Sequence, residues 1–308
     1  IQAFDENTAI VMSSGKGDLS RLYKTTDGCA TWKLLFTNPD KEGFWDALKF
    51  SSKDHNFGVL LGDPVGGIFV VMLTFDGGEK WERQTLKPTA EINGESVFAA
   101  SNSSLLISYP GGRMFGTGGR GGPRVISLGS GPTDVYEGDV SQTKKLPWSA
   151  SQNSETLPSN SQSETAGIFS FAIDNGPTGP TVVAVGGDFK RPDDRGNTAW
   201  TNVFENSSDP KRMFGFKAAK TPPHGYRSSV AYDPNTKTWI TVGPNGTDIS
   251  TDDGKNWRPL KPTQGEPVDA DKNWNALSLP FVVGPNGRIG KLRAIAISTA
   301  ESSKDKKE

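Results

Sequence analysis

The chain is poor in the residues that usually carry redox, metal or nucleophilic chemistry. Its 308 residues include one cysteine, Cys29, and two histidines, His55 and His224. A single cysteine excludes an internal disulfide, and a catalytic zinc or a Ser-His-Asp triad needs histidines that the chain barely has. CxxC, HxxH and HExxH motifs are absent, and so is the glycine fingerprint of nicotinamide-binding folds. We therefore expect neither a metal nor a cofactor, and a redox enzyme would need another physical basis.

Long apolar runs and an excess of one charge are missing as well. No run approaches the ~20 apolar residues that a helix needs to cross a bilayer. The 34 Lys and Arg against 35 Asp and Glu give a formal net charge of −1, so no overall field attracts nucleic acid or an anionic membrane. The sequence begins at Ile1, within a strand pattern, without an initiator methionine or a leader. We expect that a leader has been removed and that the protein is a periplasmic or secreted monomer.

Turn-forming residues, in contrast, are abundant. The chain contains 36 Gly and 21 Pro, and only 33% of its residues are hydrophobic. This composition favours an all-β fold of many short strands over packed helices. Sixteen Phe and eight Trp can still fill a sizeable core.

One pattern occurs three times, as TTDGCATW (25–32), TFDGGEKW (74–81) and STDDGKNW (250–257). The Asp side chain can accept bonds from backbone N–H groups two or three residues on, and Gly supplies positive φ where the chain reverses. Cys29 takes that glycine position in the first copy. The Trp then opens the next strand and packs between sheets. The pattern predicts a hairpin at each copy, with six structural residues: Asp27, Trp32, Asp76, Trp81, Asp252 and Trp257.

Alternating apolar residues between turns predict six four-stranded antiparallel sheets. Such hairpins cannot bury their own apolar faces, so the sheets should stack radially as the blades of a β-propeller. Six sheets could be the whole ring; alternatively, the ring has seven and one blade lies upstream of Ile1. The expected sheets span residues 1–38, 44–84, 94–138, 167–206, 226–260 and 274–298, within a single domain over residues 1–298.

The third sheet is the least regular of the six. Its strands are expected at residues 94–101, 104–110, 113–119 and 123–129. Residues 139–166 are rich in Ser, Gln, Asn and Pro and predict an exposed, mobile insertion. Residues 299–308 predict a disordered charged tail.

The three Asp-to-Trp patterns resemble Asp-box, or BNR, repeats. Together with VLLGDP, VAVGGDF, ITVGPNG and FVVGPNGRIGKL, they are similar to bacterial Asp-box propellers related to the photosystem II stability and assembly factor family. Sortilin-type, xyloglucanase and sialidase propellers are more distant likenesses. The resemblance covers nearly the whole chain apart from residues 139–166. It implies a β-propeller, usually with one more blade before the first sheet found here, and implies little about activity because Asp-boxes are structural turns.

A propeller places its second-to-third-strand loops on one face, together with the segments that lead into the innermost strands. We call this the axial loop face, and binding residues in such folds usually lie on loops held by the scaffold. The loops contribute Asp63, Arg120, Asp188, Lys190, Arg191, Asn245, Asn286 and Arg288. The leading segments contribute Trp45, Asp46, Glu95, Tyr226, Arg227, Trp274 and Asn275. Mixed charges and aromatic rings suit a sugar, a small polar ligand or a partner peptide, unless the charges simply pair with one another.

The sequence therefore favours an exported binding or assembly scaffold with a protein or glycan ligand. The alternative is a glycoside hydrolase or lyase in which Asp46 is paired with Asp63 or Asp188, and such chemistry needs carboxylates about 5–10 Å apart. A sialidase-like site built from arginines and Tyr226 lacks the Arg-Ile-Pro motif of that family. A deep aromatic-lined pocket around two carboxylates would favour the enzyme, and a charge-paired face would favour the scaffold.

Overall fold

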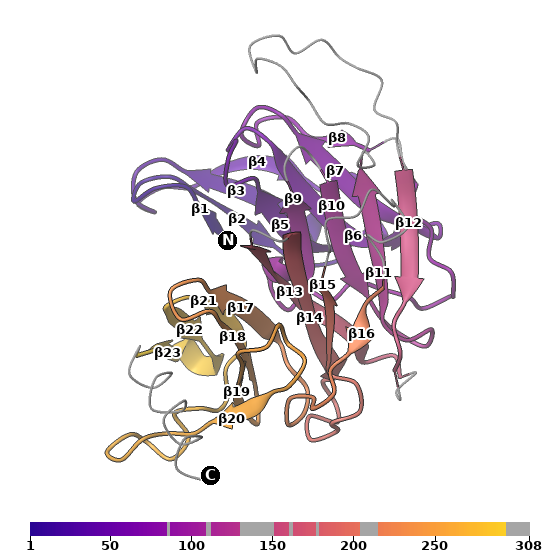
Figure 1. Cartoon of the computed structure of the whole chain (residues 1–308). Helices are drawn as coiled ribbons and strands as arrows, with labels where there is room; N and C mark the ends of the chain where they lie inside the picture. The colour runs from indigo at the N-terminus through magenta and orange to yellow at the C-terminus, as the bar shows by residue number, and fades with distance from the viewer. Residues whose placement is uncertain are drawn as a thin grey trace.

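The computed structural model describes residues 1–84, 87–108, 112–129, 151–159, 163–176, 179–203 and 215–293. These residues form a six-bladed β-propeller with three short 3₁₀ helices among them and no α-helix. Figure 1 shows the sheets following one another in chain order, from the indigo first sheet to the yellow sixth sheet. Their innermost strands contact one another in the same order: β1 with β5, β5 with β9, β9 with β13, β13 with β17 and β17 with β21. The predicted all-β propeller is confirmed.

Five sheets have four antiparallel strands, and the sixth has three within the described residues. The first two sheets are β1 (Gln2–Ala3), β2 (Ala9–Ser13), β3 (Arg21–Thr25), β4 (Lys33–Thr37), and β5 (Trp45–Phe50), β6 (Gly58–Val65), β7 (Ile68–Thr74), β8 (Glu82–Arg83). The next two are β9 (Leu105–Ser108), β10 (Gly112–Thr117), β11 (Arg124–Gly129), β12 (Ser151–Thr156), and β13 (Ala166–Gly176), β14 (Gly179–Asp188), β15 (Ala199–Val203), β16 (Lys217–Ala218). The last two are β17 (Ser229–Asp233), β18 (Thr238–Gly243), β19 (Gly246–Ser250), β20 (Arg258–Leu260), and β21 (Ala276–Ser278), β22 (Phe281–Val283), β23 (Ile289–Lys291).

The core lies between neighbouring sheets, and strand periodicity explains how it is filled. On β6, Leu60 packs with residues of the first sheet, while its neighbours Val59 and Leu61 pack with Phe115 of the third sheet. Successive side chains of a strand point to opposite faces, so a blade between two others must be apolar on both faces. This is why the inner strands appear in the sequence as continuous apolar runs.

The three Asp-to-Trp turns share one set of hydrogen bonds. In the second turn, Asp76 Oδ1 accepts from the Lys80 backbone N–H at 2.9 Å and from the Thr74 hydroxyl at 2.9 Å. The same bonds occur at Asp27 and at Asp252. The Asp side chain thus closes the turn at all three copies, but the backbone N–H that it accepts from lies four residues on, where two or three were expected.

The three tryptophans differ in burial, and this corrects one expectation. Trp81 and Trp257 are 9% and 4% exposed, and each donates its indole N–H to a turn carbonyl, whereas Trp32 is 37% exposed. Trp81 packs with Ile10 of the first sheet, so each such Trp lies against the preceding blade. No preceding sheet covers Trp32 within the described residues, so the prediction that it packs between sheets is wrong. The same open side leaves room for Cys29, at φ +73°, in the glycine position.

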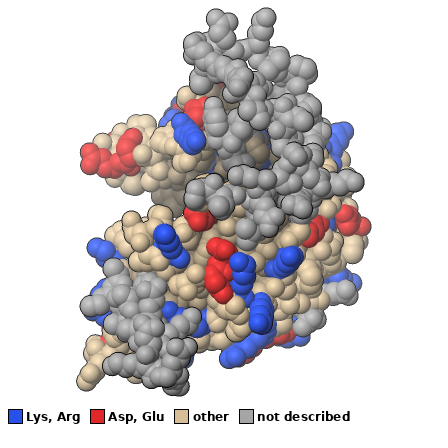
Figure 2. Space-filling view, in the orientation of Figure 1, with Lys and Arg blue, Asp and Glu red and all other residues tan. Residues whose placement is uncertain are grey.

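The outward faces of the first and sixth sheets, which have no neighbouring sheet on that side among the described residues, are partly exposed to solvent. On the sixth sheet Val282 packs toward the fifth sheet, while Phe281, Val283 and Ile289 point the other way and are 51%, 44% and 73% exposed. In Figure 2 the lobe that carries β1–β4 stands apart from the body below it at the left of the view. The first and sixth sheets therefore do not bury each other as adjacent inner blades do.

The third sheet differs from its predicted strands. Residues 94–101 form no strand, and β9 is the innermost strand of this sheet. Its outermost strand is β12, Ser151–Thr156, inside the segment predicted as an exposed insertion. The sequence did not predict this strand because its side chains are polar. An outermost strand with little apolar surface lacks the alternation of apolar and polar residues on which the prediction rests. The expected strand at 294–298 and the tail at 299–308 lie outside the described residues.

A short 3₁₀ helix, η2 (Asn102–Ser104), lies among the innermost strands. Asn102 Oδ1 accepts from the Leu48 backbone N–H at 3.1 Å, and the Ser103 and Ser170 hydroxyls are 2.7 Å apart. Leu48 belongs to β5 and Ser170 to β13, so η2 links the second and fourth sheets near the axis. The other 3₁₀ helices, η1 (Gly17–Leu19) and η4 (Pro285–Gly287), lie in second-to-third-strand loops.

Candidate functional site

Two β-bulges place a pair of carboxylates on the axial loop face. The register of β5 with β6 jumps from Trp45↔Gly62 to Ala47↔Leu61, which leaves Asp46 as the extra residue. The register of β6 with β7 jumps between Gly62 and Pro64, which leaves Asp63 as the extra residue. Bulges redirect side chains and are common beside functional sites. Adjacent bulges therefore bring together two acids that are 17 positions apart in the sequence.

The Asp46–Asp63 pair is held in a poorly hydrated environment. Asp46 is 4% exposed, and its Oδ2 has no hydrogen-bond partner. Burial first, and then the neighbouring Asp63 carboxylate, raises the pKa of Asp46 to about 9. Burial also raises the pKa of half-buried Asp63 to about 6, although the Val97 backbone N–H donates to its Oδ1 at 3.0 Å. At neutral pH the pair therefore carries about one negative charge.

Four aromatic rings continue from this pair across the face. Val97, which binds Asp63, is followed by Phe98, whose ring stacks on Phe169 with centroids 4.3 Å apart. Phe169 is itself the extra residue in a bulge between β13 and β14. Tyr226 packs edge-on against Phe169 at 4.8 Å, and Phe189 lies 6.4 Å from Phe98. Phe189 remains 44% exposed, so this axial aromatic cluster (Phe98, Phe169, Phe189 and Tyr226) presents an apolar surface to solvent.

The other buried acids of this face are held by arginines. Arg124 donates to Glu95 at 2.8 and 2.9 Å, and both side chains are buried. Arg227 donates through Nε to Asp248 at 2.8 Å, again with both side chains buried. These pairs satisfy the charges internally, as buried ion pairs must.

Asp188 is similarly occupied. The Thr165 hydroxyl donates to its Oδ1 at 2.6 Å, and Arg191 Nε donates to its Oδ2 at 3.0 Å. Burial alone would raise the pKa of Asp188, but the hydrogen bonds from Thr165, Arg191 and the Lys190 backbone outweigh burial and lower it. Asp188 is thus an ionised structural acid and is poorly suited to donate a proton.

The structure separates the predicted ligand-binding residues into buried and exposed sets. Trp45, Tyr226, Arg227 and Trp274 are buried, and Trp45 stacks on Phe36 with centroids 5.5 Å apart. Burial raises the pKa of Tyr226, which does not suit it to act as a nucleophile. The exposed or part-exposed set is Arg120, Lys190, Arg191, Asn275 and Arg288.

Most of the exposed cations have partners. Arg120 Nε donates to Glu164 at 2.8 Å. Arg288 donates to Asp269 at 2.8 Å and lies over the Trp274 ring at 4.4 Å. Lys and Arg are interspersed with Asp and Glu over the face seen in Figure 2, without a large patch of one sign. Arg120, Arg191 and Arg288 are thus held in ion pairs with nearby carboxylates.

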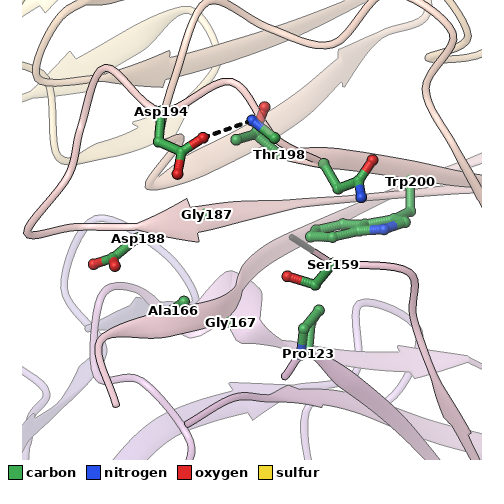
Figure 3. A pocket seen from close by; sticks show the side chains of 11 residues that line it. Pro123, Ser159, Ala166, Gly167, Gly187, Asp188, Asp194, Thr198 and Trp200 are labelled. Atoms are coloured by element: carbon green, nitrogen blue, oxygen red, sulfur yellow. Dashed lines mark hydrogen bonds between the residues drawn. The ribbon is translucent and has the colours of Figure 1, made fainter. Parts of the chain in front are cut away.

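A small pocket opens between the third and fourth sheets on this face (Figure 3). It is small, since its empty volume is only about 260 Å³ even when open solvent is included. Asp188 lines it, whereas Asp46 and Asp63 do not. Figure 3 shows Asp188 and Asp194 on one side and the Trp200 ring on the other. The remaining lining residues are Pro123, Ser159, Ala166, Gly167, Gly187, Gly196, Asn197 and Thr198.

Sequence reasoning missed the aromatic cluster and one buried polar group. Phe98, Phe169 and Phe189 stand in ordinary apolar patterns, and only the bulge at Phe169 and the loop at Phe189 turn them to the axis. His224 Nδ1 lies 2.7 Å from Asp248 Oδ1, beside Arg227. Neither group has a sequence signal, because both depend on contacts between segments that are distant in the chain.

The described residues contain no group of three His, Cys, Asp or Glu side chains that could hold a metal ion. Among those same residues there is no helix long and apolar enough to cross a membrane.

The fold and this face define the chain as a β-propeller. No protein-family model matches it, and no curated protein sequence does. Among solved structures, a protein provisionally assigned as a 6-phosphogluconolactonase from Bacteroides fragilis is 10% identical, with a TM-score of 0.50 over 94% of this chain and 82% of that one. "YCF48 bound to D1 peptide" is 16% identical, with a TM-score of 0.41 over 94% and 79%. An α-L-arabinanase from Penicillium chrysogenum, solved with arabinobiose, is 14% identical, with a TM-score of 0.41 over 81% and 73%. At these identities the likeness shows the fold alone.

Proposed function

We propose that this chain is an Asp-box propeller that works outside the cytoplasm as a binding scaffold and holds a segment of a partner protein on its axial loop face. The observation that carries the proposal is the pairing of charges on that face. Glu95, Asp188 and Asp248 are all occupied by arginines, so they are not free to act on a substrate. The pocket between the third and fourth sheets is small, and the bulge carboxylates do not line it.

The axial aromatic cluster supplies the contact surface for such a partner. Phe189 stands 44% exposed at the end of β14, supported by Phe98 and Phe169, which hold one another by stacking. Aromatic side chains in a rigid setting are frequent anchors of protein–protein contacts because they bury much area at little cost in conformational entropy. A partner segment with an apolar side chain would cover Phe189.

A peptide-display selection on the whole chain tests this proposal. Peptides selected on the wild type should bind Phe189→Ser at least tenfold more weakly. Phe75→Ser is the matched control, because Phe75 is 55% exposed in the β7–β8 turn, away from the axial aromatic cluster. If no selected peptide distinguishes the two variants, the axial loop face is not the binding surface.

A second function, glycoside hydrolysis or a lyase reaction, is favoured by the raised pKa values of Asp46 and Asp63. A carboxylic acid that stays protonated at neutral pH can serve as a general acid, and a nearby carboxylate can serve as nucleophile or base. A screen of chromogenic glycosides on the wild type and Asp63→Asn separates the two functions. Turnover that disappears in the variant would establish the enzyme and refute the scaffold.

A further inference from the structure

The bulge carboxylates differ from every other buried acid of the described chain in their lack of a cation. Glu95, Asp188 and Asp248 each face an arginine, and buried Asp271 has Lys261 at 3.8 Å. Within the described residues Asp46 and Asp63 take part in no ion pair, and the only hydrogen bond that Asp63 accepts is from the Val97 backbone.

The missing counter-ion has a physical consequence. A carboxylate that is taken out of water is strongly destabilised unless it is paired, so an unpaired buried acid either binds a proton or needs a cation from another molecule. Two adjacent bulges aim both acids at the same place, and Oδ2 of Asp46 is left without a partner there. Packing alone would not require two acidic side chains at this position.

We propose that the Asp46–Asp63 pair is the receptor for a cationic side chain, a lysine ammonium or an arginine guanidinium, on the bound segment. This inference rests on the proposed scaffold function for the identity of the ligand. Half-buried Asp63 is the group that the cation reaches, and it carries the negative charge of the pair at neutral pH, whereas buried Asp46 holds its proton. The missing cation is thus supplied by the partner.

The surroundings suit an organic cation better than a metal ion. Phe98 follows Val97, the residue that binds Asp63, and opens the axial aromatic cluster. Aromatic faces attract ammonium and guanidinium groups and cover their apolar stems. A divalent metal such as Ca²⁺ takes six to eight oxygen ligands, and the described residues contain no group of three His, Cys, Asp or Glu side chains that could hold a metal ion.

Small cationic probes test the site without a partner. N-acetyl-lysine amide and N-acetyl-arginine amide, titrated into the whole chain at pH 7.5 and followed by calorimetry, should bind, whereas N-acetyl-norleucine amide should not. Asp63→Asn should weaken probe binding at least tenfold. Asp54→Asn is the matched control, because exposed Asp54 lies in the turn at the opposite end of β5 and β6. Urea midpoints of both variants establish that they are folded.

Two results would overturn the inference: equal binding of the lysine and norleucine probes, or equal binding of the lysine probe by the wild type and Asp63→Asn. The peptides selected by display separate this inference from the scaffold proposal. Peptides that depend on Phe189 but lack Lys and Arg, and that bind Asp63→Asn normally, would leave the scaffold intact and remove the cation receptor. Probe binding without any Phe189-dependent peptide would keep the cation site and remove the scaffold.

Discussion

At the scale of single residues, the chain keeps two kinds of buried acid. Burial alone would raise the pKa of Asp248, but its hydrogen bond with His224 and the Arg227 guanidinium lower it, so the side chain is charged. Asp46 has no such partner, and its pKa is raised. The difference is one of contacts and not of burial, since both side chains are almost wholly inaccessible. The two kinds respond in opposite ways to pH and to mutation.

The raised pKa of Asp46 predicts a stability that falls with pH. The folded state binds the Asp46 proton up to pH about 9, whereas the unfolded chain releases it near its ordinary pKa of 3.8. The stability from this proton is therefore fully present below pH 3.8 and is lost as pH rises toward 9. Urea midpoints at pH 5 and pH 8 should differ less in Asp46→Asn than in the wild type. An equal difference in both proteins would show that Asp46 is not protonated in the fold.

Removing one partner of a buried ion pair should be costly. Arg227→Met leaves Asp248 charged and uncompensated, so we expect a loss of about 3–5 kcal/mol in the free energy of unfolding. Arg120→Met breaks the exposed pair with Glu164 and should cost about 1 kcal/mol or less. Urea unfolding of both variants measures the contrast. Similar losses in the two would mean that Asp248 finds another cation.

At the scale of elements, the Asp-to-Trp turn closes through its own hydrogen bonds, but its contribution to stability depends on the adjacent sheet. The Asp and Thr or Ser side chains close the turn in all three copies. The tryptophan stabilises the protein only where a preceding sheet covers it, as Val183 and its neighbours cover Trp257. Three copies of one sequence pattern are therefore expected to contribute unequally to the free energy of unfolding.

The contrast between the tryptophans is measurable. Trp257→Ala should cost about 3–5 kcal/mol as a large-to-small core change. Trp32→Ala, at the exposed copy of the same turn, should cost about 1 kcal/mol or less, as surface substitutions do. Chemical denaturation should be followed by circular dichroism, because each substitution removes a fluorescent side chain. Equal costs would indicate that Trp32 is covered in solution.

At the scale of the whole molecule, the propeller is held together sheet by sheet. Each inner blade buries both of its faces, whereas the far faces of the first and sixth sheets keep apolar side chains in solvent. Buried apolar area between consecutive sheets is the main source of stability, and the open faces contribute little.

Substitutions on the fifth and sixth sheets should reveal this difference. Ile240→Ala removes a buried side chain between these sheets and should cost about 2–5 kcal/mol. Ile289→Ala, on the open face of the sixth sheet, should change the free energy of unfolding by about 0.5 kcal/mol or less. Urea midpoints compare them directly. A large loss at Ile289 would mean that the open face is covered in solution.

The propeller could be predicted from the amino-acid sequence, because the Asp-to-Trp turns and the alternation of apolar residues are local features. The sequence also proposed Asp46 and Asp63 as candidate site residues. Contacts in the folded chain were needed to show that bulges bring these two acids together and that arginines pair with Glu95, Asp188 and Asp248. The same holds for the strand β12 at polar residues 151–156 and for the exposure of Trp32. Pairing register and counter-ion choice depend on contacts between segments far apart in the chain, and a local pattern does not encode them.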